Sequence, residues 1–186
     1  MKILGLYTHL NNVHIYMSDG QQVFYEEQLI FEERALSIQL PILLKKITQD
    51  SKFSCIALQN GPGAFTSLRV TLAFVQGLCT GWGIPIYACS HFDLLKNAYT
   101  IQNGTIAVQN KAALLPAVSV KDGFLGEPIQ LPAQETDVSL IRPNESDTVN
   151  LGKILYDMAI QNKSDWIKAI QLAPNYCFLP AYKKAP

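Results

Sequence analysis

The sequence has few charged residues and no excess of either sign. Fifteen basic residues balance fifteen acidic ones, and charged residues make up only 16% of the 186-residue chain. No net charge therefore attracts the protein to nucleic acid or to an anionic membrane, so any contact with RNA would be local or supplied by a partner. The hydrophobic share of 48% is high, and it favours a permanent partner that covers the surplus apolar surface.

The sequence also lacks paired cysteines, metal-ligand spacings and long hydrophobic runs. The four cysteines, at 55, 79, 89 and 177, contain no C-x-x-C pair, so we expect buried free thiols. The three histidines have no spacing that is typical of metal ligands. The first residues are too short an apolar run for a signal peptide, and no run is long enough to span a membrane. We therefore expect a cytoplasmic protein with no metal and no membrane contact.

The order of the expected elements indicates an α/β fold with a mixed sheet. Three strands within residues 3–30 are joined by tight turns, so they form an antiparallel meander. A helix over 32–49, a strand over 53–59, a helix over 66–82, a strand over 84–89 and a helix over 91–97 follow. Crossover helices that lead to parallel strands cover the faces of such a sheet. This order resembles the ribonuclease-H-like half of actin-like folds.

The composition changes near Gly104, and we place a domain boundary there. Residues 1–103 form a well-ordered N-terminal lobe, and residues 104–186 form a reduced, divergent C-terminal lobe with a tail. In this second lobe we expect strands over 105–109 and 113–120, a turn at Asp122 and Gly123, and a helix over 148–161. The stretch 126–147 is rich in proline and acidic residues, so we expect little regular structure in it.

The most informative motif is the turn Gly61-Pro62-Gly63, which lies between a strand and a helix. Glycine-rich turns at this position often bind phosphate through backbone N–H groups at the start of the helix. However, the turn lacks the Lys-Ser/Thr ending of a Walker A loop, and its glycines do not read G-x-G-x-x-G. Two interpretations stay open: a phosphate loop of another type, or a structural turn that aims the helix.

The helix over 66–82 is apolar around nearly twice the arc of about 100° that packing on a sheet requires. Its apolar residues and glycines form one broad face: Leu68, Val70, Leu72, Phe74, Val75, Gly77, Leu78, Cys79, Gly81 and Trp82. Each exposed helical glycine costs about 1 kcal/mol relative to alanine, but it lets another helix approach closely. The second lobe could cover this surface, yet its small size favours a partner protein.

The run from Gly61 to Val70, GPGAFTSLRV, closely resembles the GPGSFTGLR signature of the TsaB (YeaZ) family. The segments 34–41 and 83–90 also resemble that family in register, and the segment 179–183 does so more weakly. The resemblance covers residues 1–97 well and the rest faintly. It implies an actin-like ATPase fold in a divergent and shortened family member.

The resemblance implies a non-catalytic scaffold that binds the TsaD-type enzyme through the helix over 66–82. That enzyme forms the threonylcarbamoyl group on adenosine 37 (t6A37) of tRNAs that read codons beginning with adenine. A TsaE-type ATPase would join a larger complex, a homodimer is possible, and tRNA would be contacted only indirectly. The implied partner interface consists of Phe65, Leu68, Arg69, Thr71, Leu72, Phe74, Val75 and Leu78, with Gly61, Pro62 and Gly63 as the structural turn.

Two departures from the family pattern bear on chemistry. The first strand ends in Tyr7-Thr8-His9 instead of Asp-Thr-Ser, which removes a carboxylate that a Mg²⁺ site would use. Residues 108–111 replace the family's Asp-Ala-Arg motif. We therefore expect no catalytic, cofactor-binding or metal-binding residue.

Arg69 could contact a phosphate or a partner carboxylate, or serve as a surface cation. Alternative functions are a small ATPase or kinase of the actin-like superfamily, or a homodimeric remnant with an altered role.

Overall fold

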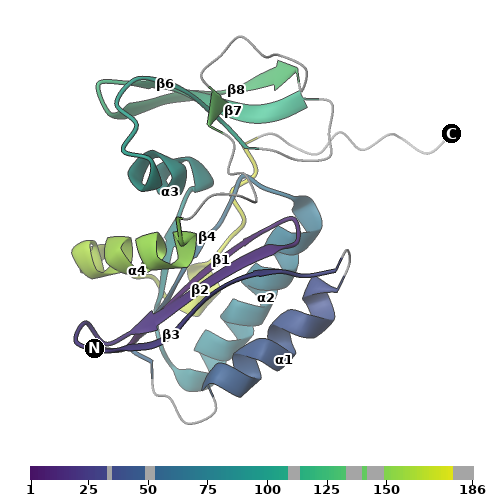
Figure 1. The fold of residues 1–186 in the computed structure, drawn as a ribbon, viewed down its shortest axis with the longest axis vertical. Helices are drawn as coiled ribbons and strands as arrows, with labels where there is room; N and C mark the ends of the chain where they lie inside the picture. The colour runs from purple at the N-terminus through teal and green to yellow at the C-terminus, as the bar shows by residue number, and fades with distance from the viewer. Residues whose placement is uncertain (33–34, 49–52, 109–113, 133–139, 142–148, 178–186) are drawn as a thin grey trace, which may run out of the picture.

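The structure is a computed structural model that describes residues 1–32, 35–48, 53–108, 114–132, 140–141 and 149–177. A five-stranded sheet with the order β3-β2-β1-β4-β5 forms its centre (Figure 1). Its strands are β1 (Ile3–His9), β2 (Asn12–Ser18), β3 (Val23–Ile30), β4 (Cys55–Gln59) and β5 (Ile86–Cys89). The first three strands are antiparallel, whereas β4 and β5 run parallel to β1. This arrangement confirms the predicted mixed sheet of the ribonuclease-H-like type.

The register of the parallel strands brings the end of β1 close to the glycine turn. Ile3 of β1 lies opposite Cys55 of β4, and Leu6 lies opposite Leu58. The carboxyl ends of parallel strands meet at one edge of a sheet. His9, at the end of β1, therefore lies at the same edge as the turn that follows β4.

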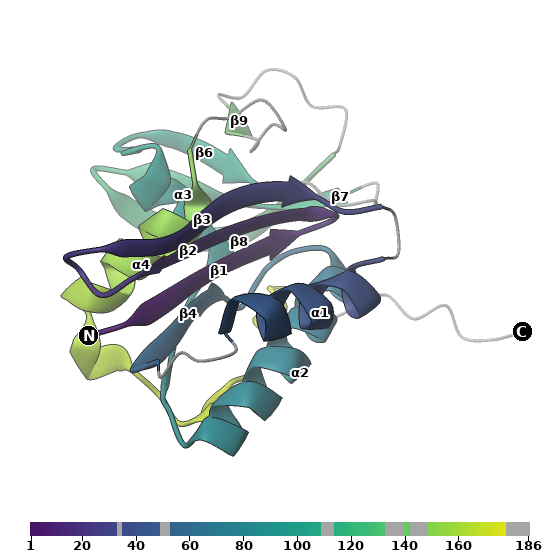
Figure 2. The ribbon, with the colours of Figure 1, turned by 60° about the horizontal axis from the view of Figure 1, so that its bottom comes forward.

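Helices cover both faces of this sheet (Figure 2). The helices α1 (Leu36–Thr48) and α2 (Phe65–Trp82) lie side by side on one face, and α4 (Leu151–Gln161) covers the other. Side chains alternate between the two faces along each strand, so two apolar clusters form. Leu4, Leu6, Ile56 and Leu58 are buried in the cluster under α1 and α2. Ile3, Cys55 and Ala57 belong to the cluster that contains Leu155 and Ala159 of α4.

The helix α4 approaches β1 unusually closely. A side chain at Gly5 would overlap the backbone carbonyl of Gly152 in the first turn of α4. Asn150 begins the helix, because its side-chain oxygen accepts bonds from the N–H groups of Gly152 and Lys153. The C-terminal half of the chain thus contributes a layer to the first sheet.

A second sheet has the order β8-β7-β6-β9. It consists of β6 (Gly104–Ala107), β7 (Leu114–Lys121), β8 (Phe124–Pro132) and β9 (Leu140–Ile141). The helix α3 (His91–Ala98) contacts both β6 and α4. The short 3-10 helices η1 (Lys163–Asp165) and η2 (Ala169–Gln171) follow α4. The second sheet begins at Gly104, yet α4 packs on the first sheet, so the proposed boundary at 103/104 stays a prediction.

The strand β8 corrects the expectation of little regular structure after residue 126. It pairs with β7 as a hairpin whose turn is Asp122 and Gly123, as predicted. Pro128 and Pro132 lie within β8, and both disfavour a strand by composition alone. They are tolerated because β8 is an edge strand, where one row of N–H groups has no ladder partner.

Candidate functional site

The turn Gly61-Pro62-Gly63 is held by hydrogen bonds from both neighbouring elements. The side-chain oxygen of Gln59 accepts a bond from the Gly61 N–H at 2.6 Å, and its amide donates to the Thr8 carbonyl at 3.0 Å. From the other side, the His91 backbone N–H donates to the Gly61 carbonyl at 2.7 Å. The turn is therefore fixed between the ends of β1 and β4 and the start of α3.

Gly61 adopts a backbone conformation that favours glycine. Its φ angle is +116°, and the peptide bond between Gly61 and Pro62 is cis. A side chain at Gly61 would also overlap the backbone carbonyl of Asn175. The positive φ angle and the close approach of the Asn175 carbonyl both require glycine at this position. The role of Gly61 as a structural turn residue stays a prediction, and these two observations support it.

Three aromatic side chains, those of Tyr7, His9 and His91, meet at the end of β1. The rings of His9 and His91 lie with their centroids 5.0 Å apart, and the Tyr7 and His91 rings lie 5.5 Å apart. All three side chains are buried. A phenol and two imidazoles lack the carboxylate oxygens through which proteins usually bind Mg²⁺. This set of residues does not fit a magnesium–phosphate site.

The environment of His91 keeps its imidazole neutral. Complete burial and, to a smaller extent, the neighbouring His9 lower the pKa of His91 to about 3, although the bond to the Pro62 carbonyl opposes both. The distances fit one tautomer: Nδ1–H donates to the Pro62 carbonyl at 2.9 Å, and Nε2 accepts from the Tyr7 hydroxyl at 3.3 Å. Burial also raises the pKa of Tyr7, so its hydroxyl stays a donor. Ser90 places His91 here by capping α3, as the sequence predicts.

The structure places half of the predicted partner interface inside the chain. Leu68, Thr71, Leu72 and Val75 are all buried, because this side of α2 packs on the sheet. The Thr71 hydroxyl is hydrogen-bonded to the Thr8 hydroxyl at 2.7 Å. These four side chains therefore hold α2 on its own sheet, and their prediction as partner contacts is corrected. Their helical spacing indicated an apolar face but could not show which half of it the sheet would cover.

The other predicted apolar residues of α2 are more accessible. Phe65 is 41% exposed, while Phe74 and Leu78 are partly buried. Gly77 is exposed, and no atom of the described part of the chain lies within 4 Å of a Cβ built there. The same holds for Gly81. The outward side of α2 thus leaves room for the backbone of another helix.

The helix α1 continues this surface. Ile38 and Ile42 are 66% and 64% exposed, whereas Leu40 and Leu44 on the opposite side of α1 are completely buried. The two isoleucines therefore point away from the sheet. We call the outward surface of Ile38, Ile42, Phe74, Gly77 and Gly81 the α1–α2 face.

Arg69 is engaged by aromatic side chains of the chain itself. Its Nε donates to the Tyr176 hydroxyl at 2.7 Å, and its guanidinium carbon lies 3.7 Å from the centroid of the Phe65 ring. Cation–π contacts and a hydrogen bond both stabilise this geometry. The contact with Tyr176 was not predicted, because residues 107 positions apart in the sequence give no local signal of contact. The same applies to the histidine pair, whose members lie on β1 and α3.

No three His, Cys, Asp or Glu side chains come together as a metal-binding group within the described residues. Nor is any described helix both long and apolar enough to cross a membrane. The predicted absence of metal, cofactor and catalytic residues stays a prediction. Residues 109–111 and 179–183, which bear on the family resemblance, lie outside the described residues.

Comparisons with known proteins bear on the class of protein. A family model described as TsaD, tRNA N6-adenosine threonylcarbamoyltransferase, matches residues 32–121. The Escherichia coli (strain K12) tRNA threonylcarbamoyladenosine biosynthesis protein TsaB is 24% identical over 135 residues, which are 73% of this chain and 54% of that protein. The chain thus spans about half the length of this curated relative.

Two solved structures share the fold over nearly the whole chain. YeaZ from Pseudomonas aeruginosa has a TM-score of 0.69 and 18% identity, covering 94% of this chain and 99% of its own. A second structure, described as an uncharacterized protein with similarity to peptidase YeaZ from the same organism, has a TM-score of 0.66 and 18% identity, covering 95% and 99%. The fold is therefore that of the YeaZ structures. With the TsaB sequence match, it supports the assignment of this chain to the TsaB/YeaZ family, as the glycine-turn signature predicts.

Proposed function

We propose that this chain is a non-catalytic partner of a TsaD-type enzyme in the formation of t6A37 on tRNA. The named role of the E. coli relative in threonylcarbamoyladenosine biosynthesis supports the pathway. The match to the TsaD family model supports a partner that is related to the chain itself. A TsaE-type ATPase would complete the complex, and tRNA would be bound mainly by the other subunits because this chain has no net charge.

The observation that carries the proposal is the α1–α2 face. Two isoleucines that are about two-thirds exposed lie on α1, and the neighbouring helix α2 carries two glycines with open space above them. Exposed apolar side chains gain free energy when a partner removes them from water. Glycines on a helix surface let a second helix approach to the short end of the usual interaxial range of about 8–10 Å. A partner helix could pack its backbone against the glycines and its apolar side chains against the isoleucines.

The non-catalytic part of the proposal is supported by the end of β1. Tyr7 occupies the position where an actin-like ATPase would carry a carboxylate, and His9 and His91 pack beside it. Calorimetry with Mg·ATP tests this part directly. We expect no saturable heat from the isolated chain, and micromolar affinity for ATP would overturn it.

Co-purification with the TsaD-type protein of the same cell tests the partnership. The variant Ile42→Glu places a charge on the α1–α2 face, so we expect it to abolish the complex without unfolding the chain. Ile170→Glu is the matched control, because Ile170 is 84% exposed and lies on η2, outside this face. Equal retention of the partner by wild type and Ile42→Glu would refute the proposed docking surface.

The same face could instead join two copies of this chain, as expected for a homodimeric remnant with an altered role. Sedimentation of the chain with and without the TsaD-type protein separates the two cases. A heterodimer that forms at the expense of any homodimer supports our proposal. A homodimer that persists in excess TsaD-type protein contradicts it.

A further inference from the structure

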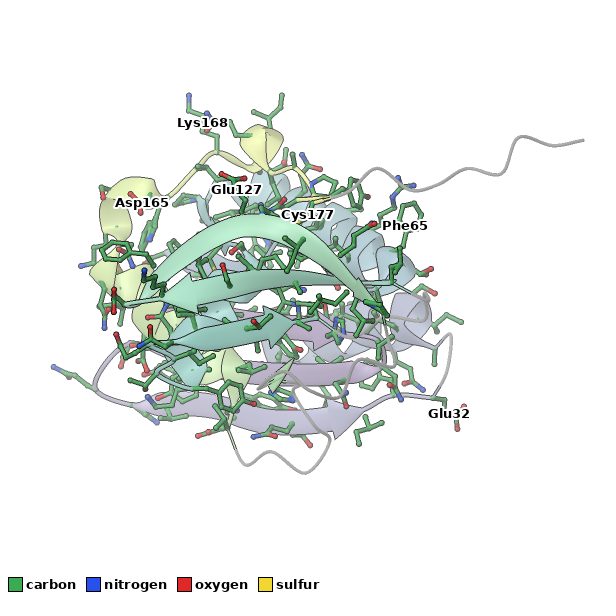
Figure 3. The ribbon with its side chains drawn as sticks, turned by 90° about the horizontal axis from the view of Figure 1, so that it is seen from above. Glu32, Phe65, Glu127, Asp165, Lys168 and Cys177 are labelled. Carbon is green, nitrogen blue, oxygen red and sulfur yellow. The ribbon has the colours of Figure 1, made fainter. Side chains whose placement is uncertain are left out.

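The last described segment of the chain, residues 166–177, runs back along α2 and ends beside the glycine turn. Figure 3 shows its path, with Asp165 just before it, Lys168 within it and Cys177 at its end, on the side of Phe65. Ile167 pairs with Ile86 at the edge of the first sheet. From there the segment passes the flank of α2 that carries Arg69 and Gln76. We call residues 166–177 the C-terminal strap.

The strap is attached to α2 by polar and apolar contacts in the middle of its path. The Gln76 amide donates to the Ala169 carbonyl at 2.9 Å. Ala169 and Leu172 are buried in the same cluster as Leu68 and Val75 of α2. These contacts cover the polar flank of α2 and leave the α1–α2 face open.

The end of the strap closes over the glycine turn. The Asn175 N–H donates to the Asn60 carbonyl at 2.6 Å, and the Asn60 amide donates to the Ala173 carbonyl at 3.2 Å. The Asn175 carbonyl occupies the space where a side chain at Gly61 would lie. The strap can therefore lie this close to the turn only because residue 61 has no side chain.

Tyr176 fastens the strap to the first turn of α2. Its ring stacks on Phe65 with centroids 5.8 Å apart and 26° between the planes, and its hydroxyl accepts the Arg69 Nε bond. This first turn has little stabilisation of its own. Ala64 is its N-cap and supplies no side-chain cap, and no acidic residue lies in the turn. In place of a cap, the contacts of Tyr176 with Phe65 and Arg69 stabilise the first turn of α2.

We infer that the C-terminal strap is a latch that orders the glycine turn and the first turn of α2, and that it thereby regulates partner binding at the α1–α2 face. With the latch closed, α2 presents this face in one orientation. When Tyr176 is released, the first turn loses its lateral contacts and opens more often. The partner-binding part of this inference rests on the proposed function, whereas the ordering of α2 does not.

Hydrogen exchange of the full chain tests the latch. We expect Tyr176→Ala to speed exchange of the amides in residues 61–72 by at least about tenfold, because it loses both the hydrogen bond to the charged Arg69 and the stack on Phe65. Tyr176→Phe keeps the stack and loses the hydroxyl, so its effect should be smaller. Ile170→Ala, on the exposed surface of the strap, is the control and should leave exchange unchanged. No change in Tyr176→Ala, or an equal rise in every strand and helix, would refute the latch.

Affinity for the TsaD-type protein tests the regulatory part with the same variants. We expect Tyr176→Ala to weaken binding several-fold while Ile170→Ala binds as wild type. If exchange rises locally in Tyr176→Ala but affinity stays equal to wild type, the latch orders α2 without regulating the partner. If wild type itself does not bind, the proposed function fails, and the exchange result still decides whether the latch exists.

Discussion

Replacing Gly77 by alanine should stabilise the isolated chain. Gly77 lies in the interior of α2, it is exposed, and a Cβ built there meets no described atom within 4 Å. Alanine loses less backbone entropy than glycine when a helix forms, and the difference in an exposed helix is about 1 kcal/mol. No steric term opposes this gain, so we expect the free energy of unfolding to rise by about 0.5–1 kcal/mol.

Urea and thermal denaturation measure this effect. For a chain of this size, 1 kcal/mol raises Tm by about 2–4 °C. Ala73→Gly is the matched control, because Ala73 is also exposed on α2 and close to Gly77 in the helix. It should lower stability by about the amount that Gly77→Ala adds. An unchanged or lower Tm for Gly77→Ala would mean that something covers this position in the free protein.

The same position should respond in the opposite direction when partner binding is measured. If Gly77 allows a partner helix to approach, a leucine there would hold the two helices apart while leaving the isolated chain folded. We expect Gly77→Leu to weaken binding to the TsaD-type protein at least tenfold, equivalent to about 1.4 kcal/mol. Wild-type affinity in Gly77→Leu, measured by titration calorimetry, would remove Gly77 from the interface. If Gly77 serves partner binding, replacing it by alanine should stabilise the isolated chain and replacing it by leucine should weaken the complex. A glycine with no role in binding would give the first effect without the second.

Other predictions concern buried groups around the turn. His91 has a pKa of about 3 in the folded state, below its unfolded value of 6.5. Its contribution to the free energy of unfolding should therefore be constant above about pH 6.5. Between pH 6.5 and pH 3 it should fall by up to about 1.4 kcal/mol per pH unit, because only the unfolded state binds the proton. His91→Gln should flatten this slope in urea denaturation between pH 4 and 6; an identical slope contradicts the assignment. Burial raises the thiol pKa of both Cys55 and Cys79 to about 12, so both should react with a thiol reagent at pH 8 only after unfolding. If the folded protein were labelled at these two positions as fast as an exposed thiol, the burial would be wrong. Gly61→Ala should cost about 1–3 kcal/mol from its positive φ alone, and a stability equal to wild type would show that the turn has another conformation.

The elements of the first half could be predicted because their signals are local. Alternating strands, tight turns and the Ser90 cap each depend on residues within a few positions of one another. The structure accordingly confirms the predicted meander, and it begins α2 at Phe65, one residue before the predicted start. The strand β8 was not predicted because its prolines disfavour a strand by local propensity, and the pairing with β7 that stabilises it involves residues that are not adjacent in the sequence.

The site was harder to predict because it depends on contacts between distant residues. Helical spacing placed Leu68, Leu72 and Val75 with Phe74 on one broad apolar face, but it could not tell the sheet side from the outward side. That division depends on the rotation of α2 about its axis. The rotation is set by contacts such as the bond between Thr71 and Thr8 on β1, which leave no periodic trace in the sequence.

The contacts around the glycine turn bear on the two interpretations of the motif. Gln59 contacts it from β4, His91 from α3 and Asn175 from the strap, and each contact is a hydrogen bond or a close fit within the chain. Such a turn needs no bound phosphate to hold its shape. A partner that docks on α2 then meets a helix whose start is already ordered, so little conformational entropy is lost on binding. Tyr7 fits this arrangement, because its hydroxyl donates to His91 and the His91 ring in turn donates to the Pro62 carbonyl of the turn.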